Sequence, residues 1–245
     1  MKILERRIPK FLLLIILSAF LLAAGGSGCM LWKKKEPQKT PEGMYSDGMR
    51  LLGQKKYTQA AEAFKRFKED YPLSPYAPLA ELRTADALYY DKNYVEAIVL
   101  YEEFKKLHPV HPEVPYVFYQ IGMSQFNQML SIDRDQTVTE KALEQFRYLI
   151  ENFPQSKYVS DGRVKMQACL RQLAENEFYI GHFYFRRGRY KSALGRFEET
   201  LKKYPDSGLD RKINPLIKTC REKIAQEERK AKEKEEREKK KRASR

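Results

Sequence analysis

Few residues in this sequence could carry chemistry, and they are scattered. Three histidines are present, His108, His111 and His182, and none belongs to an HExxH motif. The sequence also has no glycine-rich phosphate loop and no GxSxG nucleophile elbow. The run Asp133-Arg-Asp-Gln-Thr has the carboxylates of a calcium loop but lacks its glycine and its closing glutamate, so we interpret it as a helix-capping loop. The sequence therefore predicts no enzyme, no metal and no cofactor.

Cys29 has the clearest chemical role of the three cysteines. It follows a basic segment at residues 1–10, an apolar stretch at residues 11–24 and the small residues 25–28. This order is typical of an export signal. A cysteine just after the small residues is where a bacterial lipoprotein is cleaved and acylated, although Gly26 stands where a leucine is usual. We predict a signal peptide at residues 1–28 and lipidation at Cys29.

The alternative for this segment is an uncleaved membrane anchor. Residues 11–32 carry no charge and are long enough to span a bilayer. Glycines weaken the second half of that stretch as a helix, which favours lipidation. In both cases the rest of the chain is tethered to a membrane, and residues 29–43 form a polar tether rich in proline and charge.

The other two cysteines, Cys169 and Cys220, lie in helical patterns. We expect two separate buried thiols. A disulfide is the alternative, since an exported protein can form one, and the sequence does not give the distance between the two residues.

Charge is concentrated at the ends of the chain. The net charge is +14, but residues 44–220 contribute only +4 of it. A nucleic-acid-binding protein more often has a basic face within its folded body. We therefore predict no nucleic-acid partner.

One pattern recurs before four prolines. Pro72, Pro109 and Pro205 are preceded at offsets of 8, 12, 15 and 24 by an aromatic, an alanine, a second aromatic and a small residue. These are Phe64, Ala60, Tyr57 and Gly48; Tyr101, Ala97, Tyr94 and Ala85; and Phe197, Ala193, Tyr190 and Gly181. Pro154 matches at Phe146 and Ala142, while its small residue, Gly122, lies eight residues further upstream. The pattern is that of the tetratricopeptide (TPR) repeat.

The repeats predict an all-α TPR helical-hairpin solenoid of about four to five repeats at residues 44–220. Each small residue on helix A would allow the close approach of helix B, and each proline would end helix B. In the third repeat we expect helix A to continue through Leu130 and a capping box at Thr137–Glu140. One long helix is expected from about Val159 to Arg187. A kink or restart is expected at Pro215, followed by a charged helical or disordered tail at residues 221–245.

The repeats resemble those of the BamD family, the lipoproteins of the bacterial β-barrel assembly machine. The resemblance covers Met44 to Leu209, including the DRD loop and the segment FYIGHFYFRRGRYKSALGRFEETLKKYPDS. It implies an outer-membrane lipoprotein, lipid-anchored on the periplasmic face, without a cofactor. It further implies that the C-terminal repeats bind the central, POTRA-containing barrel subunit and that the N-terminal repeats receive unfolded outer-membrane proteins. The alternatives are a pilotin-type TPR lipoprotein and a membrane-tethered enzyme.

Helix A of each TPR lines the concave surface, so its residues are the candidates for a peptide groove. Alignment on Gly48, Ala85 and Gly122 predicts an aromatic groove that suits extended chains with alternating apolar side chains. The predicted residues are Tyr45, Met49, Leu52, Leu82, Arg83, Asp86, Tyr89, Tyr90, Tyr116, Tyr119, Met123 and Phe126. The alternative is that several of these aromatics pack against a preceding repeat.

A second candidate contact lies in the fourth repeat. Arg187, Arg189, Lys191 and Arg196 surround one short helix. We select Arg196 as the partner contact because it aligns with an arginine of the family. The alternative is a solvated basic face.

Overall fold

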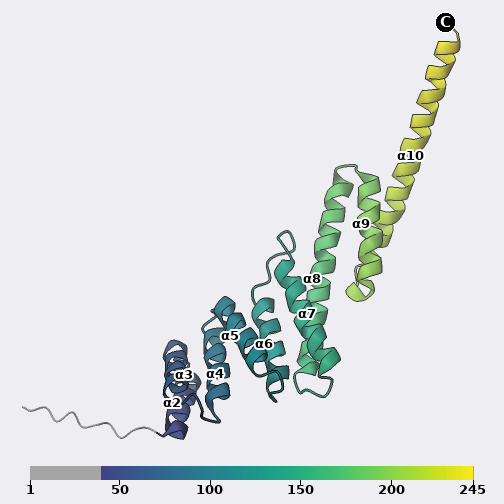
Figure 1. Ribbon diagram of the computed structural model, residues 1–245. Coiled ribbons are helices and arrows are strands. Elements are labelled where there is room, and N and C mark those ends of the chain that lie inside the picture. Colours follow the sequence, from purple (N-terminus) through teal and green to yellow (C-terminus); the bar gives the residue numbers. More distant parts are fainter. Residues whose placement is uncertain (1–39, 245) are drawn as a thin grey trace, which may run out of the picture. The chain divides into compact units, whose positions relative to one another are not determined.

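The computed structural model of the protein describes residues 40–244, and within them the regular structure is entirely helical (Figure 1). Consecutive helices pack against one another in chain order and form four hairpins. The hairpins are α2 (Pro41–Gly53) with α3 (Tyr57–Asp70), α4 (Ala77–Tyr90) with α5 (Tyr94–Leu107), α6 (Val114–Phe126) with α7 (Thr137–Asn152), and α8 (Val159–Arg186) with α9 (Tyr190–Lys203). A 3-10 turn, η1 (Pro205–Ser207), leads to α10 (Asp210–Ala243). The predicted all-α TPR solenoid is confirmed.

The repeating small residues allow the two helices of a hairpin to approach closely. At three of the four positions, a Cβ atom added to the glycine would collide with the aromatic ring of the partner helix. The added Cβ atom would lie 2.6 Å from the Phe64 ring at Gly48, 2.8 Å from the Phe146 ring at Gly122 and 2.7 Å from the Phe197 ring at Gly181. In the second hairpin Ala85 has this position, and it packs in one buried cluster with Tyr101. The spacing found in the sequence is therefore a packing requirement.

The turns that leave each hairpin share one local structure. Each second helix ends before the repeating proline, as predicted. The side chain two residues after the proline then accepts a hydrogen bond from a backbone N–H two residues further on. These bonds run from Tyr76 to Ser74 (3.2 Å), from Glu113 to His111 (3.2 Å), from Tyr158 to Ser156 (3.3 Å) and from Leu209 to Ser207 (3.4 Å). Each turn is thus closed by its own polar groups.

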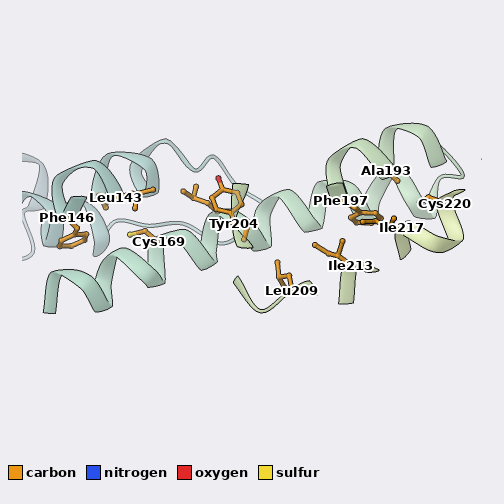
Figure 2. Close-up of a cluster of buried hydrophobic side chains, with 13 residues drawn as sticks. Leu143, Phe146, Cys169, Ala193, Phe197, Tyr204, Leu209, Ile213, Ile217 and Cys220 are labelled. Carbon is orange, nitrogen blue, oxygen red and sulfur yellow. The ribbon is translucent and has the colours of Figure 1, made fainter. Parts of the chain in front are cut away.

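The buried core differs along the solenoid. Three small clusters fill the spaces between successive hairpins from α2 to the start of α8. From α7 to α10, a single cluster runs through four helices, from Leu143 and Phe146 at one end to Ile217 and Cys220 at the other (Figure 2). The 28-residue helix α8 makes this continuity possible, because it is long enough to contact both α7 and α9. This long helix was predicted to within one residue at its end.

Three boundaries differ from the sequence predictions. Helix α2 begins at Pro41, inside the segment expected to be polar tether. Helix α6 ends at Phe126, so the predicted continuation through Leu130 is wrong. The predicted capping box is also wrong, because Thr137 lies inside α7 and its own N–H donates to Oδ1 of Asp135 at 2.9 Å. A carboxylate two residues before the helix is the stronger acceptor and replaces the threonine hydroxyl.

The loop between α6 and α7 is held against α8. The side chain of Asn176 donates to the carbonyl of Ile132 at 2.6 Å, and Gln172 donates to the carbonyl of Leu130. Within the loop, Gln136 donates to the carbonyl of Ser131 at 2.9 Å. These acceptors are available because the chain has left the helix, which explains why α6 stops early. The interpretation of this segment as a helix-capping loop is confirmed.

The last helix, α10, is continuous through Pro215 and across the expected boundary at residue 221. Its first turns bury Ile213, Ile217 and Cys220 against the core. Beyond Ile224 every described residue is exposed, so the charged tail is a single solvated helix as far as Ala243. None of the helices in residues 40–244 combines the length and the hydropathy needed to cross a membrane. The apolar stretch at residues 11–32 and Cys29 lie outside the described residues.

Candidate functional site

Five of the predicted groove residues belong to a set of seven tyrosines on successive repeats, which we call the tyrosine face. It consists of Tyr45 on α2, Tyr76 before α4, Tyr89 and Tyr90 on α4, Tyr116 and Tyr119 on α6, and Tyr158 before α8. The ring contacts within it fall into three groups. The centroid distances are 5.2 Å for Tyr45–Tyr76, Tyr116–Tyr158 and Tyr119–Tyr158, and 5.4 Å for Tyr89–Tyr90. The face therefore crosses successive helices and is not confined to one repeat.

A buried carboxylate organises the middle of the tyrosine face. Asp86 is only 2% exposed. Its carboxylate accepts hydrogen bonds from the hydroxyls of Tyr101 at 2.7 Å and Tyr116 at 2.9 Å. Nη1 of Arg83 pairs with it at 2.5 Å, and the Arg83 guanidinium lies 5.9 Å from the ring centroid of Tyr116. One acidic side chain thus joins α4, α5 and α6.

Burial and charge set the ionisation of this cluster. Burial raises the pKa of Asp86, while the Arg83 charge and the tyrosine hydrogen bonds oppose that shift. Burial alone lowers the pKa of Arg83, but the ion pair and hydrogen bond with Asp86 outweigh it and the net direction is upward. Burial, followed by the nearby Asp86 charge, raises the pKa of Tyr116. The tyrosine is therefore neutral and acts as a hydrogen-bond donor.

The outer tyrosines are also oriented by hydrogen bonds. Tyr119 donates to Oδ2 of Asp161 at 2.7 Å, and Tyr89 accepts a bond from Asn127 at 3.0 Å. Burial is the main cause that raises the pKa of Tyr89 and of Tyr119. Because hydroxyls are bonded within the protein, the rings are held in fixed orientations and present mainly carbon surface.

Two predicted groove residues have other roles. Leu82 is fully buried in the core cluster with Tyr101 and Phe104, so its assignment to the groove is wrong. The reason is that α4 packs on both sides, and the position three residues before Ala85 faces the neighbouring helices. Phe126 is half-buried and packs against Phe146 with centroids 6.4 Å apart. The remaining predicted residues, including Met49 and Tyr90, are half-buried or exposed, apart from Asp86.

Sequence reasoning missed three members of the site: Tyr76, Tyr158 and Asp161. The two tyrosines do have a common signal, since each lies four residues after a repeating proline, Pro72 and Pro154. Asp161 becomes part of the site only because α8 begins beside α6. Its contact with Tyr119 joins residues 42 positions apart, which local spacing does not predict.

The predicted partner contact Arg196 lies on α9, where it is already paired. Its Nη1 is 2.8 Å from Oε2 of Glu177 on α8, and its side chain is 41% exposed. Nζ of Lys191 lies 3.3 Å from Oε1 of Glu228 on α10. The guanidinium carbon of Arg187 lies 4.9 Å from the centroid of the Phe183 ring. Arg196 thus links α9 to α8 and Lys191 links α9 to α10, and a role of Arg196 in partner binding stays a prediction.

The remaining reactive side chains have structural roles. Cys169 and Cys220 are both buried and free, which confirms the expectation of two separate thiols. Burial raises the pKa of Cys169 to about 12, so its thiol is protonated at neutral pH. Nε2 of His108 contacts Glu81 at 2.9 Å. In residues 40–244, no group of three or more histidine, cysteine or acidic side chains is placed to hold a metal ion.

The fold places this chain in the class of helical-repeat proteins, in which each repeat packs against its neighbours. The family model described as "YfiO: Outer membrane lipoprotein" matches residues 37–237. The chain belongs to this YfiO/BamD family of outer membrane lipoproteins.

Three relatives show the extent of the similarity, and each carries the name "Outer membrane protein assembly factor BamD". The protein of Caulobacter vibrioides is 31% identical over 195 residues, which cover 78% of this chain and 64% of the relative. This chain therefore spans just under two thirds of that protein. The relative from Neisseria meningitidis serogroup B is 29% identical, with coverages of 81% and 78%. The relative from Pasteurella multocida is 25% identical, with coverages of 89% and 86%.

Proposed function

We propose that this protein is a non-catalytic assembly factor that receives unfolded outer-membrane proteins and passes them to a central β-barrel subunit. The observation that carries this proposal is the tyrosine face, a set of aromatic side chains on α2, α4 and α6 and before α4 and α8. Membership in an outer membrane lipoprotein family supports the membrane setting. The names of the relatives support the assembly role.

The tyrosine face suits an extended polypeptide. Alternate side chains of a β-strand lie on one side, roughly 6.6 Å apart, and outer-membrane strands alternate apolar and polar residues. The apolar side chains would contact rings such as Tyr89 and Tyr119, whose hydroxyls are already bonded to Asn127 and Asp161. Ring contacts of this kind depend little on the identity of each apolar side chain. A receiver of many different substrates needs that tolerance.

Replacing Tyr89 and Tyr119 together by alanine tests this role. We expect weaker photocrosslinking to a C-terminal peptide of an outer-membrane protein, with an unchanged helical circular-dichroism signal. Tyr89→Phe with Tyr119→Phe should keep most of the crosslinking, because the rings remain. Tyr148→Ala is a matched control, since Tyr148 is an exposed tyrosine on the second helix of its hairpin. Undiminished crosslinking in the double alanine variant, or a loss that follows unfolding, contradicts the proposal.

The membrane anchor is the second part of the proposal. We propose that Cys29 is acylated and that the protein is held on the periplasmic face of the outer membrane. Cys29→Ser should abolish incorporation of labelled palmitate and shift the protein to the soluble periplasm or leave it unprocessed. If neither the label nor the fractionation changes, the apolar segment at residues 11–32 is itself the anchor.

The third part concerns the C-terminal repeats, which we propose bind the central barrel subunit through a surface that includes Arg196. Arg196→Glu should reduce co-purification of that subunit. The substitution also places two carboxylates together at Glu177, so a charge swap is needed as the control. Arg196→Glu combined with Glu177→Arg restores the internal ion pair. If the swap restores co-purification, Arg196 acts by holding α8 to α9 and is not the contact.

A further inference from the structure

Two aliphatic side chains protrude from the solenoid without a partner in the described chain. Leu73 is 97% exposed and Val110 is 95% exposed, whereas the next most exposed large apolar residues in residues 40–244, Val95 and Val164, reach 64%. Both occupy the same place in the repeat, directly after the exit prolines Pro72 and Pro109. In the third and fourth repeats this place holds polar residues, Gln155 and Asp206.

The fold does not use these two side chains. Each turn is closed by a polar side chain that follows, Ser74 in the first repeat and His111 in the second. Neither Leu73 nor Val110 belongs to a buried cluster. A single exposed apolar residue is ordinary on a protein surface, but two that are almost completely exposed at the same position of successive repeats point to a shared external apolar environment.

Both turns lie at the edge where the chain enters the solenoid. The first helix of every hairpin starts at this edge, so the beginning of α2 at Pro41 and the turns after α3 and α5 are on the same side (Figure 1). Eleven residues separate Cys29 from Pro41 in the sequence. Extended, that segment reaches about 40 Å at most. A lipid on Cys29 would therefore hold the beginning of α2 within about 40 Å of the membrane surface, a distance that allows this edge to reach it.

We propose that the exit turns of the first two repeats rest on the phospholipid surface and insert Leu73 and Val110 into it. This inference rests on the proposed anchor at Cys29. A lipid surface fits better than a protein pocket, because the two side chains are isolated tips on separate turns and do not form one patch. Charges of both signs flank the tips, with Lys68 and Asp70 before one and Lys106 and Glu113 beside the other. The attraction is therefore apolar, and salt should affect it little.

The experiment measures how deeply each position lies in the membrane. The full-length, lipidated protein is placed in phospholipid vesicles after Leu73→Cys or Val110→Cys and attachment of an environment-sensitive fluorophore. Cys169 and Cys220 are buried and will not take the label in the folded protein. Matched controls are Val95→Cys, an exposed valine at the opposite edge, and Gln155→Cys, the same place in the third repeat. Lipids with brominated chains and aqueous iodide are the two quenchers.

We expect brominated lipid to quench labels at positions 73 and 110 and iodide to quench those at 95 and 155. Adding Leu73→Asp to the Val110→Cys protein should lower the insertion equilibrium by about tenfold or more, because one apolar contact is lost and a charge is brought to the surface. Gln155→Asp should have no such effect. High salt should leave the quenching pattern unchanged.

Other outcomes would overturn the inference. Equal iodide quenching at positions 73 and 95 means that the edge does not touch lipid. Protection from iodide without quenching by brominated lipid, seen only when a partner protein is added, means that the tips form a protein interface. Labelled palmitate is measured in the same preparation. Acylation without lipid quenching rejects the inference and leaves the anchor intact, whereas a lack of acylation rejects the proposed anchor and, with it, this inference.

Discussion

The N-terminal hairpins and the C-terminal helices bury their apolar side chains in different ways. From α2 to α7, small apolar clusters fill separate layers, and Asp86 and its tyrosines connect neighbouring repeats through hydrogen bonds. From α7 to α10, one apolar cluster runs through four helices, and ion pairs such as Arg196–Glu177 close its surface. Both regions expose aromatic rings, such as Tyr90 in the first and Phe183 in the second, each 48% exposed, so the difference lies in how the core is divided.

This difference is one of how far each layer of the solenoid depends on its neighbours. In a solenoid each repeat contacts only its neighbours, so layers that do not share a core can respond locally. Tyr45 and Tyr89 of the tyrosine face pack against these separate clusters, whereas Tyr119 packs against the continuous core of α7 to α10. That core ties four helices together, since the long helix α8 contacts both α7 and α9.

The largest expected effect on stability comes from removing the phenylalanine ring that packs against the hairpin glycine in each region. Phe64 and Phe197 are both fully buried, and each packs against the glycine of its hairpin. Phe197→Ala should lower the free energy of unfolding by about 3–5 kcal/mol, since a cavity opens in the continuous core. Phe64→Ala should have a local effect, because the first repeat can open alone.

Amide hydrogen exchange distinguishes the two outcomes. Phe64→Ala should accelerate exchange in α2 and α3 and leave α8 and α9 protected. Phe197→Ala should accelerate exchange throughout α8, α9 and the first turns of α10. If Phe64→Ala accelerates exchange equally in both regions, the solenoid unfolds as one unit and the comparison fails.

A smaller effect is expected from the polar network of the N-terminal region. Asp86→Asn keeps the shape of the side chain but removes the charge that balances Arg83. We expect a loss of about 2–3 kcal/mol in the free energy of unfolding, because a charged group with buried atoms loses its counter-charge. Asp161→Asn is the matched control, since Asp161 accepts a tyrosine hydrogen bond at an exposed site. Its cost should stay below about 0.5 kcal/mol, and equal costs from urea denaturation would contradict a special role of Asp86.

The sequence predicted the parts of this comparison that depend on local spacing. The offsets before Pro72, Pro109 and Pro205 predicted the hairpins and their close contacts, because helical packing requires a small residue at a fixed place. The spacing did not predict the Asp86 network, whose bonds to Tyr101 and Tyr116 join residues 15 and 30 positions apart. It also misplaced Leu82, because a residue on helix A can face either the concave surface or the next repeat. The angle between neighbouring hairpins decides this, and the sequence does not encode it locally.

The smallest expected effect concerns the two thiols of the C-terminal region. Cys169 and Cys220 belong to the same buried cluster but lie far apart along it (Figure 2). A disulfide between them would contribute about 2–4 kcal/mol, so a reducing agent would lower the unfolding temperature if one formed. We expect no change with dithiothreitol, because both thiols are free. Because burial raises the pKa of Cys169 to about 12, its thiol should also resist alkylation at pH 8 and react only after unfolding. Mass spectrometry of alkylated native protein checks this, and a linked peptide pair or a fall in the unfolding temperature would show that the continuous core depends on a covalent bond.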